Sequence, residues 1–252
     1  MTGDVRHVRY PRPPIIEAVV ELRFKSPVGQ DRLFGELKAR LSDRYDGKER
    51  QIHTVEVSAV FDEDSIATHA RRKETIRCLS SYDGLRLLGC GKHLLSVHAL
   101  APYPGWDNLR EQLTEAVHAL GRPIRALPLE LAAVRYIDVI TLPAPTVTLE
   151  NYFTFVPPPI PALPGSHTSL AFRRESRDPG SGILSRLDLV TVPSPTGLPN
   201  LAIRYDLTVL HPYASDVSLT EGDWSSPVEA LHLMQREAFE QSITDATREL
   251  FR

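Results

Sequence analysis

The sequence contains little cysteine, little glycine relative to proline, and no long apolar run. Its 252 residues include two cysteines, 14 glycines and 21 prolines. Cys78 and Cys90 suit a reducing compartment, where free thiols pack as small hydrophobic groups. No stretch is apolar over the roughly 18 residues that a membrane span needs, and the Pro-rich segment 1–14 lacks the apolar region of a signal peptide. We therefore expect a cytoplasmic protein with no membrane partner.

An excess of charge of one sign is also missing. The 29 basic and 32 acidic residues give a formal net charge of -3, so the whole molecule is not drawn toward nucleic acid or an anionic membrane. Hydrophobic residues make up 42% of the chain and charged residues 24%, which is ordinary for a soluble globular protein. The length accommodates one large domain or two closely packed halves.

Motifs that would identify a reaction or a metal site are missing as well. None of the nine histidines forms an H-x-x-x-H pair, and no C-x-x-C occurs. Gly180-Ser181-Gly182 precedes a strand and lacks the context of a nucleophile elbow. Gly89-Cys90-Gly91 is followed by no helix start, so we interpret it as part of a hairpin. The sequence therefore predicts no cofactor, no metal ligands and no catalytic residue.

One order of elements occurs twice. A strand over 15–24 leads to a helix, hairpin strands and an amphipathic helix from Trp106, and a strand over 131–142 restarts the series, which ends in one long helix over 227–250. This order predicts an α+β fold in which tandem β-α-βββ-α halves share one curved antiparallel sheet with helices packed on one face. The TATA-binding-protein fold is the nearest geometric analogue, which says nothing about function. The halves span residues 1–128 and 129–252 and pack as one unit.

Two hairpins have a predicted register. Asp83-Gly84 favours a type I′ turn, which places Arg77 opposite Cys90 and Arg86 opposite Ser81.

In the second hairpin, strands 183–192 and 201–210 alternate apolar and charged residues. Pairing Arg186 with Asp206 and Asp188 with Arg204 sets opposite charges on one face and apolar side chains on the other. For the final helix, Ser225 or Ser226 is the expected cap, followed by Pro227 at the first helical position.

Four short motifs spread over nearly the whole chain carry a resemblance. They are Pro13-Pro14-Ile15-Ile16-Glu17-Ala18 with Glu21-x-Arg23-Phe24, Tyr103-Pro104-x-Trp106, Arg135-Tyr136-Ile137, and Ile243-Thr244-x-x-x-Arg248-Glu249-x-Phe251. Together they resemble a sporadically distributed family of bacterial proteins of similar length whose function is not established. That family usually looks like Arg-Tyr-Ile-Asn in the third motif, whereas this chain has Asp138. The resemblance implies a shared fold and no particular reaction.

Five polar residues are candidates for a groove or cleft. Glu17, Glu21 and Arg23 share one face of the first strand, with the two glutamates about 13 Å apart at 3.3 Å per residue. That separation exceeds the spacing of the paired carboxylates in glycosidases. Arg135 and Asp138 fall on opposite faces of their strand, so one of them points toward the helices. We interpret this pair as part of a buried ion pair, with ligand binding as the alternative.

Basic residues gather in the first hairpin region and form a candidate basic surface. They are Arg71, Arg72, Lys73, Arg77 and Arg86. Such a surface could contact the phosphates of a nucleic acid, although most charged strand faces are merely solvated.

Three functions follow from these patterns. The first is a non-catalytic binding, scaffold or accessory protein that uses its sheet groove or a dimer surface, with a protein partner or a second copy of itself. The second is an enzyme or small-molecule sensor with a cleft between the halves, because such junctions commonly host pockets. The third and weakest is nucleic-acid binding through the basic hairpin.

Overall fold

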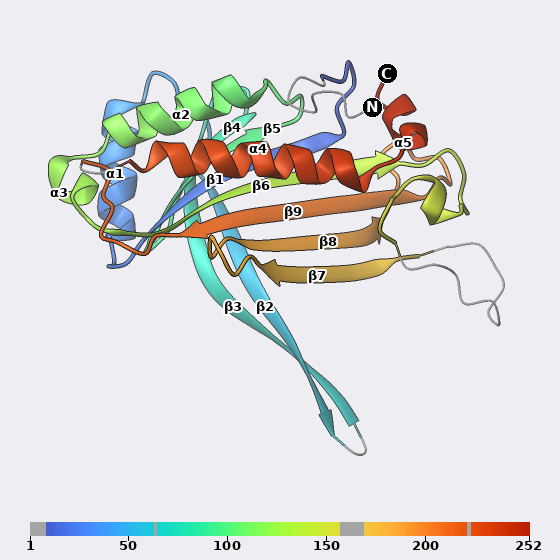
Figure 1. Ribbon diagram of the computed structural model, residues 1–252. Helices are drawn as coiled ribbons and strands as arrows, with labels where there is room; N and C mark the ends of the chain where they lie inside the picture. The colour runs from blue at the N-terminus through green and yellow to red at the C-terminus, as the bar shows by residue number, and fades with distance from the viewer. Residues whose placement is uncertain (1–8, 63–64, 157–168, 221–222) are drawn as a thin grey trace.

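A computed structural model describes residues 9–62, 65–156, 169–220 and 223–252, with the backbone alone described over 53–62 and 65–74 (Figure 1). The strands are β1 (Ile15–Phe24), β2 (Arg50–Asp62), β3 (Ser65–Ser80), β4 (Arg86–Cys90), β5 (Leu94–Leu100), β6 (Leu129–Thr141), β7 (Ala171–Arg177), β8 (Leu184–Val192) and β9 (Ala202–Pro212). The helices are α1 (Gln30–Arg40), α2 (Trp106–His118), α3 (Arg122–Arg125), α4 (Ser225–Ser242) and α5 (Asp245–Glu249), with a 3-10 turn, η2 (Leu149–Asn151). This arrangement confirms the predicted α+β class.

All nine of these strands form a single open sheet in the order β2-β3-β4-β5-β1-β6-β9-β8-β7. Every neighbouring pair is antiparallel, as predicted. The strands β1 and β6 pair at the centre, with Val20 opposite Val134. None of the helices in the described part of the chain is both long and apolar enough to cross a membrane.

Helices α1, α2 and α4 lie along one face of the sheet (Figure 1). The alternation of β1 turns Ala18, Val20 and Leu22 toward these helices, and all three are completely buried. Apolar residues at helical spacing meet them, including Leu109 of α2 and Leu231 of α4. The main core therefore fills the layer between the sheet and the helices.

The opposite face, which we call the helix-free face, has a small apolar cluster of its own. Its members come from strands β2 to β5 alone, and no described helix covers them. They are Ile76, Cys78, Leu87 and Leu94, packed with Ile52 and Leu100. At this end β2 and β3 run at a steep angle to β7, β8 and β9 (Figure 1).

Both cysteines are free and buried, as predicted. Burial raises the pKa of the Cys78 thiol to about 11 and that of Cys90 to about 12. Both groups therefore stay protonated and act as small apolar side chains.

The predicted register of the hairpin β8–β9 is wrong by two residues. Asp188 lies opposite Asp206 instead of Arg204, and Arg186 lies opposite Thr208. A two-residue shift keeps each side chain on its predicted face, so the alternation of apolar and charged residues cannot distinguish the two registers. The two aspartates instead find arginines on the neighbouring strands β6 and β7.

The hairpin β3–β4 has the predicted register, with Arg77 opposite Cys90, but its turn is not of type I′. Gly84 has a φ of 71°, whereas Asp83 does not share the positive φ that a type I′ turn requires. The Asp83 carboxylate instead accepts a hydrogen bond from the backbone N–H of Leu85 at 2.9 Å. Side-chain capping of this kind favours the ordinary right-handed conformation at Asp83.

The long C-terminal helix predicted over 227–250 is two helices. α4 ends at Ser242, and Ile243 is extended, with φ -110° and ψ 152°, before α5 begins. Ile243 forms an isolated antiparallel bridge with Phe153 and is 1% exposed. The apolar period continues through Ile243 because that residue is buried by this distant segment, so periodicity alone does not reveal the break.

Two further local predictions are corrected. Asp223 caps α4, since its Oδ1 accepts hydrogen bonds from the backbone N–H groups of Ser225 and Ser226 at 3.2 and 3.0 Å. The helix therefore begins before Pro227. Among the described residues between β6 and β7, the 3-10 turn η2 stands where a helix was expected after the strand over 131–142.

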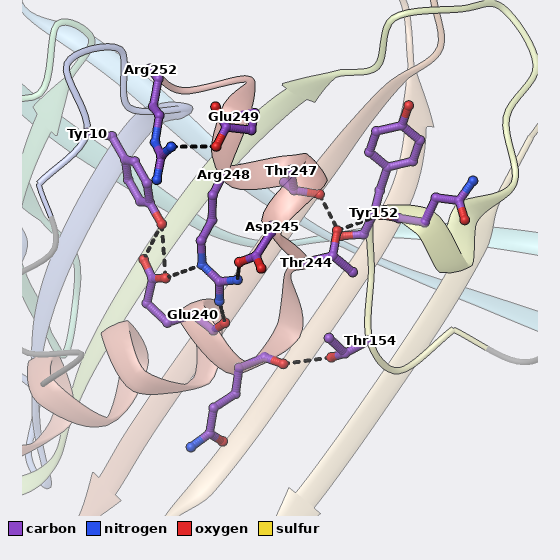
Figure 2. A network of polar contacts seen from close by, with 12 residues as sticks. Tyr10, Tyr152, Thr154, Glu240, Thr244, Asp245, Thr247, Arg248, Glu249 and Arg252 are labelled. Carbon is purple, nitrogen blue, oxygen red and sulfur yellow. Dashed lines mark hydrogen bonds and ion pairs between the residues drawn. The ribbon is translucent and has the colours of Figure 1, made fainter. Parts of the chain in front are cut away.

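A polar network joins the C-terminal helices α4 and α5 to the segment at Tyr10 and to the segment at Tyr152 (Figure 2). The Tyr10 hydroxyl donates to the Glu240 carboxylate, with distances of 2.8 and 2.9 Å to its two oxygens. Arg248 donates to the same carboxylate at 3.1 Å and to Asp245 at 2.8 Å. The Thr247 hydroxyl donates to the Tyr152 carbonyl at 2.6 Å. The polar side chains of the fourth motif thus have a structural role at this end of the sheet.

We expect Arg248→Ala to lower the free energy of unfolding by about 2–3 kcal/mol, because it leaves the buried Glu240 carboxylate without its cation. Arg252→Ala is the matched control, since Arg252 pairs with Glu249 on the surface, and it should change stability by less than about 0.5 kcal/mol. Urea denaturation of the three proteins measures both values. Equal losses in the two variants would show that the network does not stabilise the fold.

Candidate functional site on the helix-free face

Two adjacent rows of side chains cross the sheet on the helix-free face. The central row contains His98, Val19, Arg135, Thr208, Arg186 and Glu175, on β5, β1, β6, β9, β8 and β7. The acid row lies two residues further along the same strands and contains Leu100, Glu17, Ile137, Asp206, Asp188 and Arg173. Bases in the central row therefore stand beside carboxylates in the acid row.

A hydrogen-bond relay occupies the β5 end of these rows. The His98 Nδ1 lies 2.7 Å from the Glu17 carboxylate, and its Nε2 lies 2.9 Å from the Ser96 hydroxyl. With a proton on Nδ1, the imidazole donates to Glu17 and accepts from Ser96. Ser96 is 1% exposed, and its hydroxyl fills the space over Gly89, where a Cβ would lie 2.2 Å from the Ser96 oxygen.

Glu17 is the acid of this relay and carries a shifted pKa. Burial by itself would raise the pKa, but the hydrogen bond from His98 and the charges of His98 and Arg135 outweigh it and lower the pKa of Glu17. Glu17 is therefore ionised at neutral pH. Its coupling to Arg135 connects the relay electrostatically with the ion pairs of β6, β7, β8 and β9.

Arg135 holds Asp206 through two hydrogen bonds, Nε to Oδ1 at 2.7 Å and Nη2 to Oδ2 at 2.6 Å. The Asp206 side chain is only 3% exposed. Hydrogen bonding to Asp206 raises the pKa of the Arg135 guanidinium. On the next strand, Asp188 contacts Arg173 at 2.5 Å and Arg186 at 3.2 Å. Each carboxylate of the acid row thus has a cationic or imidazole partner.

Four of the five predicted groove residues lie on this face. Glu17, Glu21 and Arg23 project from β1, and Arg135 projects from β6. Arg23 contacts the Glu21 carboxylate at 3.4 Å and forms an ion pair with it. Only Glu17 and Arg135 belong to the two rows, since Glu21 and Arg23 stand further along β1.

Asp138 lies on the other face, toward the helices, opposite Tyr205 of β9. It is 2% exposed, and no ion pair holds it within the described residues. The buried ion pair predicted near this position joins Arg135 to Asp206 instead. Burial, with a smaller contribution from the Asp206 charge, raises the pKa of Asp138 to about 8. Asp138 is therefore largely a neutral acid at pH 7.

The predicted basic surface is not an open patch where the structure describes it. Arg77 lies on the helix side, 3.9 Å above the Phe34 ring, and pairs with Asp31 at 2.6 Å and Glu49 at 3.3 Å. Arg86 lies 5.9 Å from the Tyr45 ring centroid. The side chains of the remaining members lie outside the described part of the structure; these members are Arg71, Arg72 and Lys73.

The sequence did not predict the Ser96–His98–Glu17 relay or the partners in the ion pairs. Ser96 and His98 have no sequence motif around them, because Glu17, the acid that His98 contacts, comes from a strand far away in the chain. Asp206 and Asp188 were assigned to arginines of their own hairpin. No motif marks such residues, so only the strand order and register reveal the site.

No protein-family model and no curated protein matches the chain. Within the described residues, no three of the His, Cys, Asp and Glu side chains group as a metal site would require.

We expect Asp138→Asn to stabilise the protein at pH 7. The folded state raises the pKa of this acid from 3.8 to about 8, so folding binds a proton, and the stability falls as pH rises from about 4 to about 8. An amide needs no proton. The variant should therefore gain roughly 2–4 kcal/mol at pH 7 and little at pH 4.

Thermal or urea unfolding at both pH values measures the difference. Asp43→Asn, which changes an exposed carboxylate, is the control and should show no such dependence. A destabilised Asp138→Asn protein at pH 7 would contradict the assignment of a neutral Asp138.

Proposed function

We propose that this protein is a non-catalytic binding protein that holds its partner on the helix-free face of the sheet. The observation that carries the proposal is the pair of charged rows across six neighbouring strands. A protein does not usually bury carboxylates in a sheet face that only solvent contacts, because their desolvation costs free energy that ion pairs repay only in part. Charged and polar rows with fixed partners supply the complementarity that selects a partner.

We further propose that the chain consists of tandem halves, 1–128 and 129–252. The strand order supports this, because β1 and β6 pair with each other at the centre and each also pairs with the last strand of its own half, β5 or β9. A local twofold axis between β1 and β6 would relate the halves, as in the TATA-binding-protein fold. The resemblance to the bacterial family fits the same fold.

A protein partner, including a second copy of the chain in the cytoplasm, fits this face better than nucleic acid does. Arg135, Arg173 and Arg186 on this face are paired with carboxylates, so these three are less able to release the counterions of a phosphate backbone. Arg77 is neutralised on the other side of the sheet. Nucleic-acid binding therefore stays the weakest of the proposals.

We expect partner capture or self-association to depend on the exposed arginines of the two rows. Arg173→Ala combined with Arg186→Ala removes two cations that are 64% and 44% exposed. The matched control is Arg174→Ala combined with Arg32→Ala, two exposed arginines on the helix side of the sheet. Light scattering and co-purification from native lysate should show an assembly that the control retains and the first variant loses. A monomer that captures nothing, or equal capture by both variants, would refute the proposal.

An enzyme or a small-molecule sensor at the junction of the halves is the second candidate, and the Ser96–His98–Glu17 relay favours it. The order of donors and acceptors is that of a serine nucleophile, its general base and the acid that orients the base. Ser96 is 1% exposed, however, so a substrate could reach its hydroxyl only if the surrounding strands moved.

We expect no labelling of Ser96 by a fluorophosphonate probe, because the hydroxyl is buried. Mass spectrometry of the treated protein, beside Ser96→Ala, gives the answer. Labelling that disappears in Ser96→Ala would establish an activated serine and replace the binding proposal by the catalytic one.

A further inference from the structure

The hairpin of β2 and β3 extends beyond the other strands as a two-stranded arm (Figure 1). Strand β3 pairs with β4 only over residues 77–80. The rest of β3, over 65–76, pairs with residues 52–62 of β2 and with no other strand in the described structure. A two-stranded hairpin by itself is at best marginally stable in water, and three or more strands are usually needed. The arm, which we define as residues 52–62 and 65–76, therefore lacks a neighbouring strand.

The β3 edge of the arm is protected against the addition of another strand. The run Arg71-Arg72-Lys73 gives this edge three consecutive basic residues. Thr54 pairs with Glu74, whereas the next residue of β2 pairs with Arg72. Lys73 is therefore the extra residue of a β-bulge. Lysines and bulges are among the devices that keep a free edge from pairing, and two β3 edges would bring like charges together.

The β2 edge of the arm carries none of these devices. Residues 50–62 include no proline, glycine or lysine. Strand β2 is the first strand of the sheet, so its outer edge has no neighbour among the described strands. A long free edge of this kind is a template on which another strand can pair. The arm is therefore open to strand addition along β2.

The charges of β2 select a second copy of the chain as the added strand. A twofold axis perpendicular to the sheet at Glu56 pairs all of Arg50–Asp62 with the same strand of the other copy, in antiparallel order. Arg50 then lies opposite Asp62 of the second copy at both ends of the pairing. Val55 lies opposite Val57 of the second copy on each side of the axis. Opposite charges and β-branched residues directly across from one another stabilise such a pairing.

Glu56 lies opposite its own counterpart in this register, which is unfavourable. Within its own arm, however, Glu56 is already opposite Arg71. The row across the four strands therefore has two arginine positions outside two glutamate positions, and its charges balance. The repulsion between the two glutamates weakens the interface without preventing it.

We propose that the free edge of β2 pairs with the same edge of a second copy, so that the two arms form one four-stranded antiparallel sheet. In this register, Arg50 lies opposite Asp62 of the second copy. The interface uses no residue of the two charged rows on the helix-free face. It is therefore a second interaction surface, beyond the one in the proposed function.

Sedimentation of the full chain over a series of concentrations tests this interface. We expect a reversible dimer. Arg50→Asp and Asp62→Arg should each weaken the dimer by about tenfold, because each sets like charges opposite one another at both ends of the pairing. An equal mixture of these two variants should dimerise as the native chain does, since the exchanged charges then attract across the interface. Glu56→Gln should strengthen the dimer, because it removes the repulsion at the axis.

Arg177→Asp is the matched control, since it reverses an exposed arginine on β7, the strand at the opposite edge of the sheet. This variant should dimerise as the native chain does. Misfolding cannot imitate the recovery in the mixture, because both variants must be folded to pair with each other.

Four outcomes would overturn the interface. They are a monomer at every concentration, an unchanged dimer in Arg50→Asp, no recovery in the mixture, and a dimer that Glu56→Gln does not strengthen. The dimer should persist when Arg173→Ala is combined with Arg186→Ala. Loss of partner capture in that double variant therefore concerns the proposed function alone.

Discussion

The pairing of β1 with β6 is the constraint on which the rest of the structure depends. These two strands lie at the centre of the sheet. On its other side β1 pairs with β5, and β6 pairs with β9. Their backbone groups are satisfied on both sides, and β1 is buried on its helix side through Ala18, Val20 and Leu22. Val19 of β1 is 2% exposed on the other face. This central pairing therefore fixes the positions of the strands on either side of it.

The candidate site is a direct result of that pairing. Glu17 meets His98 because β1 pairs with β5, and it lies near Arg135 because β1 also pairs with β6. Without the pairing of β1 with β6, the relay and the ion pairs would be separate features. The central strands join them into one continuous band, which is why we assign a single function to the face.

Local patterns in the sequence predicted what depends on neighbouring residues. The bounds of β1, the face of Glu17 and Arg23, and the register of the hairpin β3–β4 all follow from alternation or from a short turn. Features that depend on distant segments could not be predicted in this way.

The two-residue error in β8–β9 arose because the charges of that hairpin are satisfied by other strands. Similarly, the break at Ile243 depends on Phe153, and the buried neutral state of Asp138 depends on the helices that cover it. The resemblance marked Arg135 but gave no sign of its partner, because Asp206 lies outside the four motifs.

The ion pairs between the central row and the acid row also affect how a partner would approach. Arginines that are paired with neighbouring carboxylates produce a field that falls off faster with distance than the field of a single charge, and dissolved salt weakens it further. Long-range steering would then add little to the rate of encounter, and association should proceed at the ordinary speed of uncharged surfaces. Recognition on this face would begin only at contact, so the lifetime of the complex, more than the rate of its formation, would distinguish the right partner from the wrong one.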